Sequence, residues 1–290
     1  MNYNRRNFIR LSGGAVAGVA VSSMAGMSLL SCAEKARANE PFGIQLYTLR
    51  DILPADPKGV LKQVASFGYN FVESYEGPLG MFWGMTNKDF KKYLDELGMT
   101  IVSSHTDINK DFERKAAESA EIGIKYLLCP YLGAQPSLDA YKKHADEFNK
   151  RGEICKKNGI RFGYHNHEYT FVLQEGQYPQ DVLMTNTDPA LVDYEMDIFW
   201  VVTGKQDPVT WLKKYPNRFK LSHVKDRKKN TEDRDAMTEL GTGMIDFPTV
   251  LKVAKENGME YFVTEQDTNF TTSPIKSIEQ NAAYMKNLKI

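Results

Sequence analysis

The chain has 290 residues, of which 42% are hydrophobic and 26% charged, and these proportions exclude a disordered or low-complexity protein. Its 37 basic and 37 acidic side chains balance, so the basic surface of a nucleic-acid-binding protein is not expected. Three cysteines, Cys32, Cys129 and Cys155, are too few for a disulfide scaffold. We therefore expect a globular domain of the size of a small enzyme.

The first 31 residues are predicted to be an export signal. Arg-Arg-Asn-Phe-Ile-Arg at 5–10 resembles a twin-arginine signal, and an uncharged stretch follows at 11–30. Leu-Leu-Ser-Cys at 29–32 resembles a bacterial lipobox, in which Cys32 would be acylated and become the mature amino terminus. We expect residues 32–41 to be a short tether and the protein to be a lipoprotein at the periplasmic face of a membrane. An uncleaved membrane anchor and cleavage after Ala38, which would free the protein into the periplasm, are the alternatives.

Strand-like and helix-like segments then alternate to the end of the chain. Short runs rich in β-branched and aromatic residues cover 42–49, 71–74, 100–105, 126–130, 161–166, 192–197, 219–224 and 261–265. Helical periodicity is clearest at 57–67, 88–97, 138–158, 247–257 and 277–288, and Gly98, Gly159 and Gly258 follow three of these helices. Eight β/α units in about 250 residues predict an α/β protein with a single domain at 42–290, a (β/α)8 TIM barrel. A doubly wound sheet is disfavoured because no G-x-G-x-x-G follows the first strand.

Histidines and acidic residues gather where the predicted strands end. His105, His165, His167 and His223 lie at these ends, whereas His144 lies in a predicted helix. The acidic residues at the strand ends are Glu73, Glu195, Asp197, Asp226, Glu265 and Asp267. A barrel collects such side chains at one mouth, where they are costly unless they bind a cation or each other. A mixed set of imidazoles and carboxylates from successive strands therefore predicts a divalent metal site.

Several segments resemble strands of the xylose-isomerase-like barrels, which are often called sugar phosphate isomerase/epimerases. Gly-Ile-Arg-Phe-Gly-Tyr-His-Asn-His at 159–167, Tyr-Glu-Met-Asp-Ile-Phe-Trp at 194–200 and Leu-Ser-His-Val-Lys-Asp at 221–226 resemble strands five to seven. Residues 262–265 are similar to strand eight, 68–73 to strand two, and 241–247 to a Gly-rich segment before the helix of that unit. The resemblance covers nearly everything from residue 42 onward.

The resemblance implies one divalent metal ion held by strands five to eight. Asp197, His223 and Glu265 match the family's ligands on strands six, seven and eight. The chain departs from the family at strand five, where His165 replaces the usual glutamate and His167 lies on the same face. We expect both histidines to lie within reach of the metal, one as ligand and the other as proton carrier or substrate contact. So many imidazoles favour Zn, Co or Mn over Mg or Ca.

Five strand-end residues are candidates for acid, base or positioning roles: His165, Glu195, Lys225, His105 and Glu73. Each has a simpler alternative. Glu73 could pair with an arginine at the rim, His105 could cap a helix, and Glu195 could orient a metal ligand. Lys225 could form an ion pair with Asp226 or Glu265, or could supply a proton and stabilise an oxyanion.

Aromatic residues near the strand ends are candidates for sugar binding. Tyr131 and Trp200 could stack on a sugar ring or belong to the core, and Tyr47 and Gln45 could contact substrate or only pack. Two further charged residues, Asp267 and Arg227, are expected to be solvated loop charges.

A metal with open positions next to an acid and a base supports proton abstraction beside a carbonyl, through a metal-stabilised enediolate. We therefore expect a sugar isomerase or epimerase, with β-elimination by a lyase or dehydratase of 3-keto-glycosides as the alternative. Export and the lack of a phosphate cradle favour a non-phosphorylated keto-sugar or oxidised glycoside. The alternative outside the enzymes is a lipid-anchored sugar-binding protein that does not turn over its ligand. A relative of the endonucleases that share this barrel is disfavoured by the neutral charge. A homo-oligomer is left open.

Overall fold

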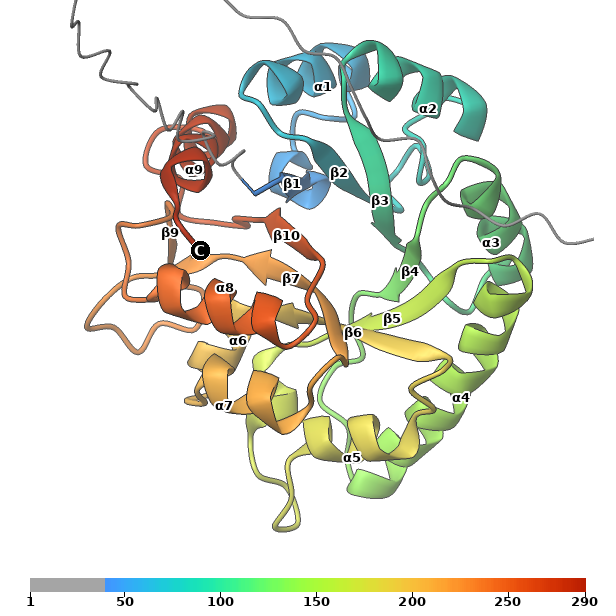
Figure 1. Cartoon of the computed structure of the whole chain (residues 1–290), viewed down its shortest axis with the longest axis vertical. Coiled ribbons are helices and arrows are strands. Elements are labelled where there is room, and N and C mark those ends of the chain that lie inside the picture. The colour runs from blue at the N-terminus through green and yellow to red at the C-terminus, as the bar shows by residue number, and fades with distance from the viewer. Residues whose placement is uncertain (1–39) are drawn as a thin grey trace, which may run out of the picture. The chain divides into compact units, whose positions relative to one another are not determined.

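The computed structural model describes residues 40–290. Eight parallel strands close into a barrel, and Figure 1 shows helices surrounding it. In order around the barrel the strands are β1 (Phe42–Gln45), β2 (Phe71–Tyr75), β3 (Thr100–His105), β4 (Tyr126–Cys129), β5 (Arg161–His165), β6 (Val192–Asp197), β7 (Phe219–Val224) and β10 (Tyr261–Thr264). Pairing of β10 with β1 closes the barrel and confirms the predicted fold. The predicted export signal and Cys32 lie outside the described residues.

The connections between strands carry the helices. They are α1 (Pro57–Ser66), α2 (Asn87–Glu96), α3 (Phe112–Glu121), α4 (Leu138–Lys157), α5 (Pro179–Asn186), α6 (Ile198–Thr203), α7 (Pro208–Lys214), α8 (Phe247–Glu256) and α9 (Pro274–Asn287). Two short 3-10 helices, η1 (Leu46–Leu49) and η2 (Glu168–Phe171), and a small antiparallel pair, β8 (Asp226–Arg227) with β9 (Met237–Thr238), complete the set. Within residues 40–290, no helix is both long enough and apolar enough to cross a membrane.

Local sequence signals explain where several helices begin and end. The Asp56 side chain accepts a hydrogen bond from the Gly59 N–H, and Pro57 occupies the first helical position of α1. Gly98, Gly159 and Gly258 follow α2, α4 and α8 with φ of 72°, 75° and 89°. Residues other than glycine seldom adopt this left-handed conformation, so these glycines end their helices as predicted.

The first predicted strand was too long. The run at 42–49 is mostly apolar, with Gln45 and Thr48 as its polar residues, but β1 ends at Gln45 and the chain turns into η1. The Gln45 side-chain oxygen accepts a hydrogen bond from the Tyr47 N–H at 3.1 Å, which stabilises the turn. Apolar content alone does not distinguish a buried strand from a buried helical turn.

The barrel interior is divided into an apolar and a polar part. Six buried apolar side chains form one cluster inside the barrel: Phe71, Val102, Tyr126, Leu128, Leu221 and Val263. Phe71 and Tyr126 begin their strands, so this cluster fills the amino-terminal part of the barrel. The buried histidines His105, His165 and His223 lie at the carboxyl-terminal ends of their strands, whereas Arg161 and Asp193 form an ion pair near the starts of β5 and β6.

Candidate active site

A cavity of about 280 Å³ opens at the carboxyl-terminal mouth of the barrel. Residues from several strand ends line it: Tyr47, His105, Pro130, Tyr131, His165, His167, Trp200, Lys225, Glu265 and Asp267. Eight of these ten positions were singled out from the sequence as site candidates, namely all except Pro130 and Asp267. The pattern of polar residues at strand ends therefore predicted most of the side chains that line this cavity.

Three imidazoles surround the carboxylate of Glu195 on β6. Glu195 Oε2 lies 2.8 Å from His105 Nε2, 2.9 Å from His165 Nδ1 and 3.2 Å from His223 Nε2. Its other oxygen, Oε1, is buried and has no hydrogen-bond partner among the described residues. We call His105, His165, Glu195 and His223 the inner donor group, since one ligand atom from each lies within 4.8 Å of the others. An imidazole-rich set with an unused carboxylate oxygen fits a divalent metal ion.

Glu73 on β2 supports the inner donor group from the opposite side of the barrel. Its Oε1 accepts a hydrogen bond from Gln45 Nε2 at 2.7 Å and lies 2.7 Å from His223 Nε2. Its Oε2 accepts a hydrogen bond from the Ser103 hydroxyl. The carboxylate is fully buried, so the alternative of an ion pair with an arginine at the rim was wrong. Sequence reasoning missed Ser103, because a serine within a strand carries no signal of its own.

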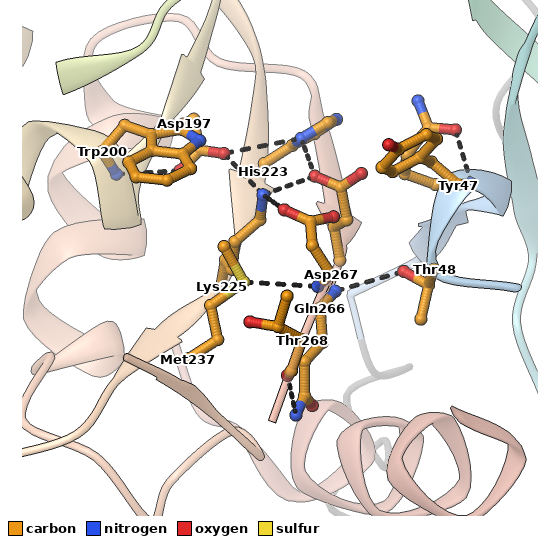
Figure 2. Close-up of polar contacts among 12 residues, drawn as sticks. Tyr47, Thr48, Asp197, Trp200, His223, Lys225, Met237, Gln266, Asp267 and Thr268 are labelled. Atoms are coloured by element: carbon orange, nitrogen blue, oxygen red, sulfur yellow. Dashed lines mark hydrogen bonds and ion pairs between the residues drawn. The ribbon is translucent and has the colours of Figure 1, made fainter. Parts of the chain in front are cut away.

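The remaining carboxylates of the mouth surround a lysine. Lys225 Nζ lies 3.0 Å from Asp197 Oδ2, 2.6 Å from Glu265 Oε2 and 2.9 Å from Asp267 Oδ2 (Figure 2). Of the alternatives left open for Lys225, the ion pair with Glu265 is present, whereas an ion pair with Asp226 is not found among the described residues. We call Asp197, His223 and Glu265 the outer donor group, because their ligand atoms also lie within 4.8 Å of one another.

Burial and neighbouring charges shift the pKa values of the inner side chains in different directions. Burial alone would lower the pKa of His105, but Glu73 and Glu195 raise it to about 9. Burial lowers the pKa of His165 well below its ordinary value, and the nearby His223 and His105 add to this effect. Burial together with the charge of Glu73 raises the pKa of Glu195 to about 7. His165 is therefore a neutral imidazole, the form that binds a metal or accepts a proton.

His167 lies outside both donor groups. Its ring stacks on Tyr169 and Trp200, with centroid distances of 5.8 and 5.3 Å, and meets the edge of Tyr131 at 5.0 Å. Burial lowers the pKa of His167 to about 3. Its Nδ1 has no hydrogen-bond partner within residues 40–290. The structure thus separates the two histidines that the sequence left as equivalents.

The three aromatic residues predicted to bind sugar all line the cavity. Tyr47 and Tyr131 are 41% and 59% exposed, whereas Trp200 is buried beneath the guanidinium of Arg234, 4.3 Å from its ring centroid. Arg234 also forms an ion pair with Glu168, at 2.6 Å. Exposed tyrosines beside a polar pocket offer ring faces to a ligand.

Two residues that were expected to be solvated loop charges are not. Asp267 lies in the cavity wall beside Lys225. Arg227 is buried, and its guanidinium donates hydrogen bonds to the Thr203 hydroxyl and to three backbone carbonyls of residues 231–234. Both interpretations were wrong, because Asp267 meets Lys225 from the end of a neighbouring strand and the chain at 231–234 folds back over the Arg227 guanidinium.

Asp226 does not line the cavity, and its side chain instead stabilises the backbone of a neighbouring segment. Its carboxylate accepts hydrogen bonds from the backbone N–H groups of Arg227, Gly241, Gly243 and Ile245 at 2.8–3.2 Å. It thereby holds the Gly-rich segment before α8 against β8.

Solved structures with the same barrel are numerous. A sugar phosphate isomerase/epimerase from Parabacteroides distasonis is 31% identical, with a TM-score of 0.74 over 88% of this chain and 97% of that chain. The IOLI protein, solved with a zinc atom, has a TM-score of 0.69 over 84% of this chain and 96% of that chain. At 15% identity it shares only the fold.

Among curated proteins, inosose dehydratase from Clostridium perfringens is 34% identical over 146 residues, which are 44% of this chain and 48% of that protein. The chain spans about half the length of the curated relatives it matches. The family described as xylose isomerase-like TIM barrel matches residues 61–288. The barrel, the strand-end site and this match agree, and the chain belongs to the xylose isomerase-like TIM barrel family.

Proposed function

We propose that the protein is a divalent-metal-dependent sugar isomerase or epimerase, which removes a proton from the carbon beside a carbonyl group. The observation that carries this proposal is the buried Glu195 carboxylate, which meets three imidazoles through one oxygen and leaves the other without a partner. Two of these imidazoles, His105 and His165, line a cavity whose walls also carry Tyr47, Tyr131 and Trp200. Similarity to a solved sugar phosphate isomerase/epimerase gives independent support.

The inner donor group would hold the metal through His105, His165, Glu195 and His223. When bound, a divalent cation supplies Lewis-acid stabilisation of negative charge on a sugar oxygen. A set of three imidazoles and one carboxylate suits Zn, Co or Mn.

His167 and Lys225 are placed to move or hold protons at the two sides of a bound sugar. His167 lines the cavity and its Nδ1 has no hydrogen-bond partner among the described residues, and on this position we assign proton transfer to it. The Lys225 ammonium also lines the cavity, and it would stabilise an oxyanion that forms when the neighbouring C–H is broken.

The charges of the cavity support a non-phosphorylated sugar. Histidines apart, Lys225 is the one cationic side chain in the cavity lining of the described chain, and three carboxylates already surround it. A phosphate dianion would therefore face Glu265 and Asp267 and would have only Lys225 to balance its two charges, whereas an oxyanion carries a single charge. Tyr47, Tyr131 and Trp200 instead offer the ring faces on which neutral sugars stack, so a keto-sugar or oxidised glycoside is the substrate class we propose.

A dehydratase reaction on the same site is the second candidate. Its support is the 34% identity to inosose dehydratase from Clostridium perfringens. The first step, removal of a proton beside a carbonyl, is the same, and expulsion of a β-oxygen substituent then replaces return of the proton. Lys225 would protonate that leaving oxygen.

Incubation of the metal-loaded protein with keto-sugars and oxidised glycosides in heavy water distinguishes these reactions. An isomerase or epimerase yields a sugar of the same composition that carries deuterium, whereas a dehydratase yields a product lighter by one water. His223→Ala should abolish either signal, and His144→Ala, on α4 away from the cavity, should preserve it. Binding of a sugar without deuterium uptake or product would instead indicate a binding protein without turnover.

We further propose that residues 1–31 direct export and that Cys32 carries the lipid anchor. Arg5, Arg6 and the Leu-Leu-Ser-Cys sequence at 29–32 support this proposal. Mass spectrometry of the mature protein from its native host should find an acylated Cys32 at the amino terminus. An intact Met1, or a chain that begins at Asn39, would refute lipidation.

A further inference from the structure

The loop that carries Tyr131 is held in place by side chains. Residues 131–135 lie between β4 and α4, and within the described chain their backbone makes no hydrogen bond to another backbone group. Backbone N–H groups that leave water need a partner, so the path of such a loop depends on the side chains that reach it. Here the hydroxyls of Tyr169 and Tyr141 accept hydrogen bonds from the loop.

Tyr169 holds the part of this loop that follows Tyr131 directly. Its hydroxyl oxygen accepts hydrogen bonds from the N–H groups of Leu132, at 3.1 Å, and Gly133, at 3.0 Å. The rings of Tyr131 and Tyr169 also meet edge to face, with their centroids 5.7 Å apart. Tyr169 therefore contacts both the backbone of the loop and its exposed aromatic side chain.

Tyr169 also supports His167 on the neighbouring loop. It belongs to η2, which begins directly after His167. The rings of His167 and Tyr169 are nearly parallel, with an angle of 4° and a centroid distance of 5.8 Å. One side chain thus contacts the aromatic residue to which we assign sugar binding and the histidine to which we assign proton transfer.

The barrel determines the position of Tyr169 itself. Its hydroxyl oxygen lies 3.4 Å from the hydroxyl of Tyr164, a fully buried residue of β5. Tyr169 is not among the residues that line the cavity, whereas Tyr131 and His167 both are. Any effect of Tyr169 on a bound sugar must therefore act through these two neighbours.

We propose that Tyr169 is a positioning residue that fixes Tyr131 and His167 relative to each other. Its hydroxyl sets the path of the Tyr131 loop and thereby the binding of the sugar. Its ring sets the orientation of the His167 imidazole and thereby proton transfer. This inference rests on the proposed function, in which both neighbours act on the substrate.

Two substitutions separate the two contributions in steady-state kinetics, with the keto-sugar that takes up most deuterium in heavy water as substrate. Tyr169→Phe keeps the ring and removes the oxygen, so KM should rise about tenfold while kcat stays close to that of wild type. Tyr169→Leu also removes the ring, and kcat should then fall by about tenfold or more. An unchanged KM in Tyr169→Phe, or the same kcat in both variants, would overturn the inference.

Tyr93→Phe is the matched control. The Tyr93 hydroxyl donates a hydrogen bond to the Lys58 carbonyl at 2.8 Å, and Tyr93 lies on α2, away from the cavity. Removal of this hydroxyl should leave both KM and kcat unchanged. The control thus shows that loss of a tyrosine hydroxyl elsewhere in the barrel does not raise KM.

Hydrogen exchange followed by mass spectrometry reports on the loop without any substrate. A peptide that covers residues 130–137 should exchange faster in Tyr169→Phe than in wild type or Tyr93→Phe, because two of its amides lose their acceptor. Peptides from the barrel strands should exchange as in wild type. Faster exchange throughout the barrel would show a general loss of stability in place of local positioning and would overturn the inference.

Nuclear magnetic resonance of protein labelled at its five histidines reports on the second contribution. The ring signals of His167 should keep their positions in Tyr169→Phe, where the stacked ring remains, and should move in Tyr169→Leu. Unmoved signals in Tyr169→Leu would show that the ring does not orient the imidazole.

These measurements separate the inference from the proposed function. If no sugar is turned over, the proposed function is refuted, and the exchange and resonance measurements still decide whether Tyr169 fixes its two neighbours. If a sugar is turned over and both variants behave as wild type, the proposed function stands and only the role of Tyr169 is refuted.

Discussion

Replacing His105 with glutamine should remove a defined part of the pH dependence of the unfolding free energy of the metal-free protein. Glu73 and Glu195 lie 3.2 and 2.8 Å from His105 Nε2, and against the effect of burial they raise its pKa to about 9. In the unfolded chain the imidazole titrates near 6.5. Because the folded pKa is the higher one, protonated His105 stabilises the fold fully below pH 6.5, and this stabilisation is lost as the pH rises through 9.

The size of this effect follows from the two pKa values. A rise from 6.5 to about 9 corresponds to about 3 kcal/mol of unfolding free energy. Urea unfolding of chelator-treated protein, followed by circular dichroism between roughly pH 6 and pH 9.5, measures it. Wild type should lose about 3 kcal/mol more than His105→Gln over this range.

A matched histidine provides the control. His144 lies half-buried on α4, and burial lowers its pKa. His144→Gln should therefore keep the wild-type loss of stability between pH 6.5 and pH 9. Saturating Zn²⁺ should diminish the difference between wild type and His105→Gln, because a bound imidazole must be neutral. Equal losses in wild type and His105→Gln without metal would refute the reasoning.

Four further substitutions test other parts of the structure. Gly243→Ala would place a Cβ 2.2 Å from Asp226 Oδ1, and it should cost about 1–3 kcal/mol of unfolding free energy in chemical denaturation; an unchanged midpoint would contradict this. Tyr131→Ala should weaken sugar binding in calorimetry without altering the melting temperature, because the side chain is 59% exposed; unchanged affinity would exclude it from the sugar site. His167→Ala should keep the bound metal but lose turnover, whereas His165→Ala should lose both, and loss of metal from His167→Ala would show that it is a ligand.

Local patterns in the sequence predicted the barrel because its strands are buried on both faces and its helices end at glycines. Most predicted strand boundaries agree with the structure to within a residue. The same patterns located the strand ends, and a barrel brings all strand ends to one mouth, so the candidate residues were found together. His105 and His223, about 120 residues apart in the chain, meet at Glu195 for this reason alone.

The pairing of charges within the mouth could not be predicted in the same way. Lys225 and Asp267 are 42 residues apart, and their contact depends on the neighbouring positions of β7 and β10. Asp267 looked like a loop charge because its local sequence is polar. The sequence predicted that His165 and His167 share a strand face, but β5 ends at His165 and His167 precedes η2, so the first ring lies among carboxylates and the second among aromatic rings. Which neighbours a side chain meets is decided by the facing strands.

The division of the barrel interior has a consequence for how this protein can change over evolutionary time. The apolar cluster around Phe71 and Tyr126 supplies cohesion at one end, and the chemistry resides in different residues at the other. Substitutions at the mouth can therefore alter the reaction while the burial that maintains the scaffold stays intact. Such a separation lets a lineage exchange one sugar reaction for another through few mutations, since selection for folding and selection for turnover act on different positions.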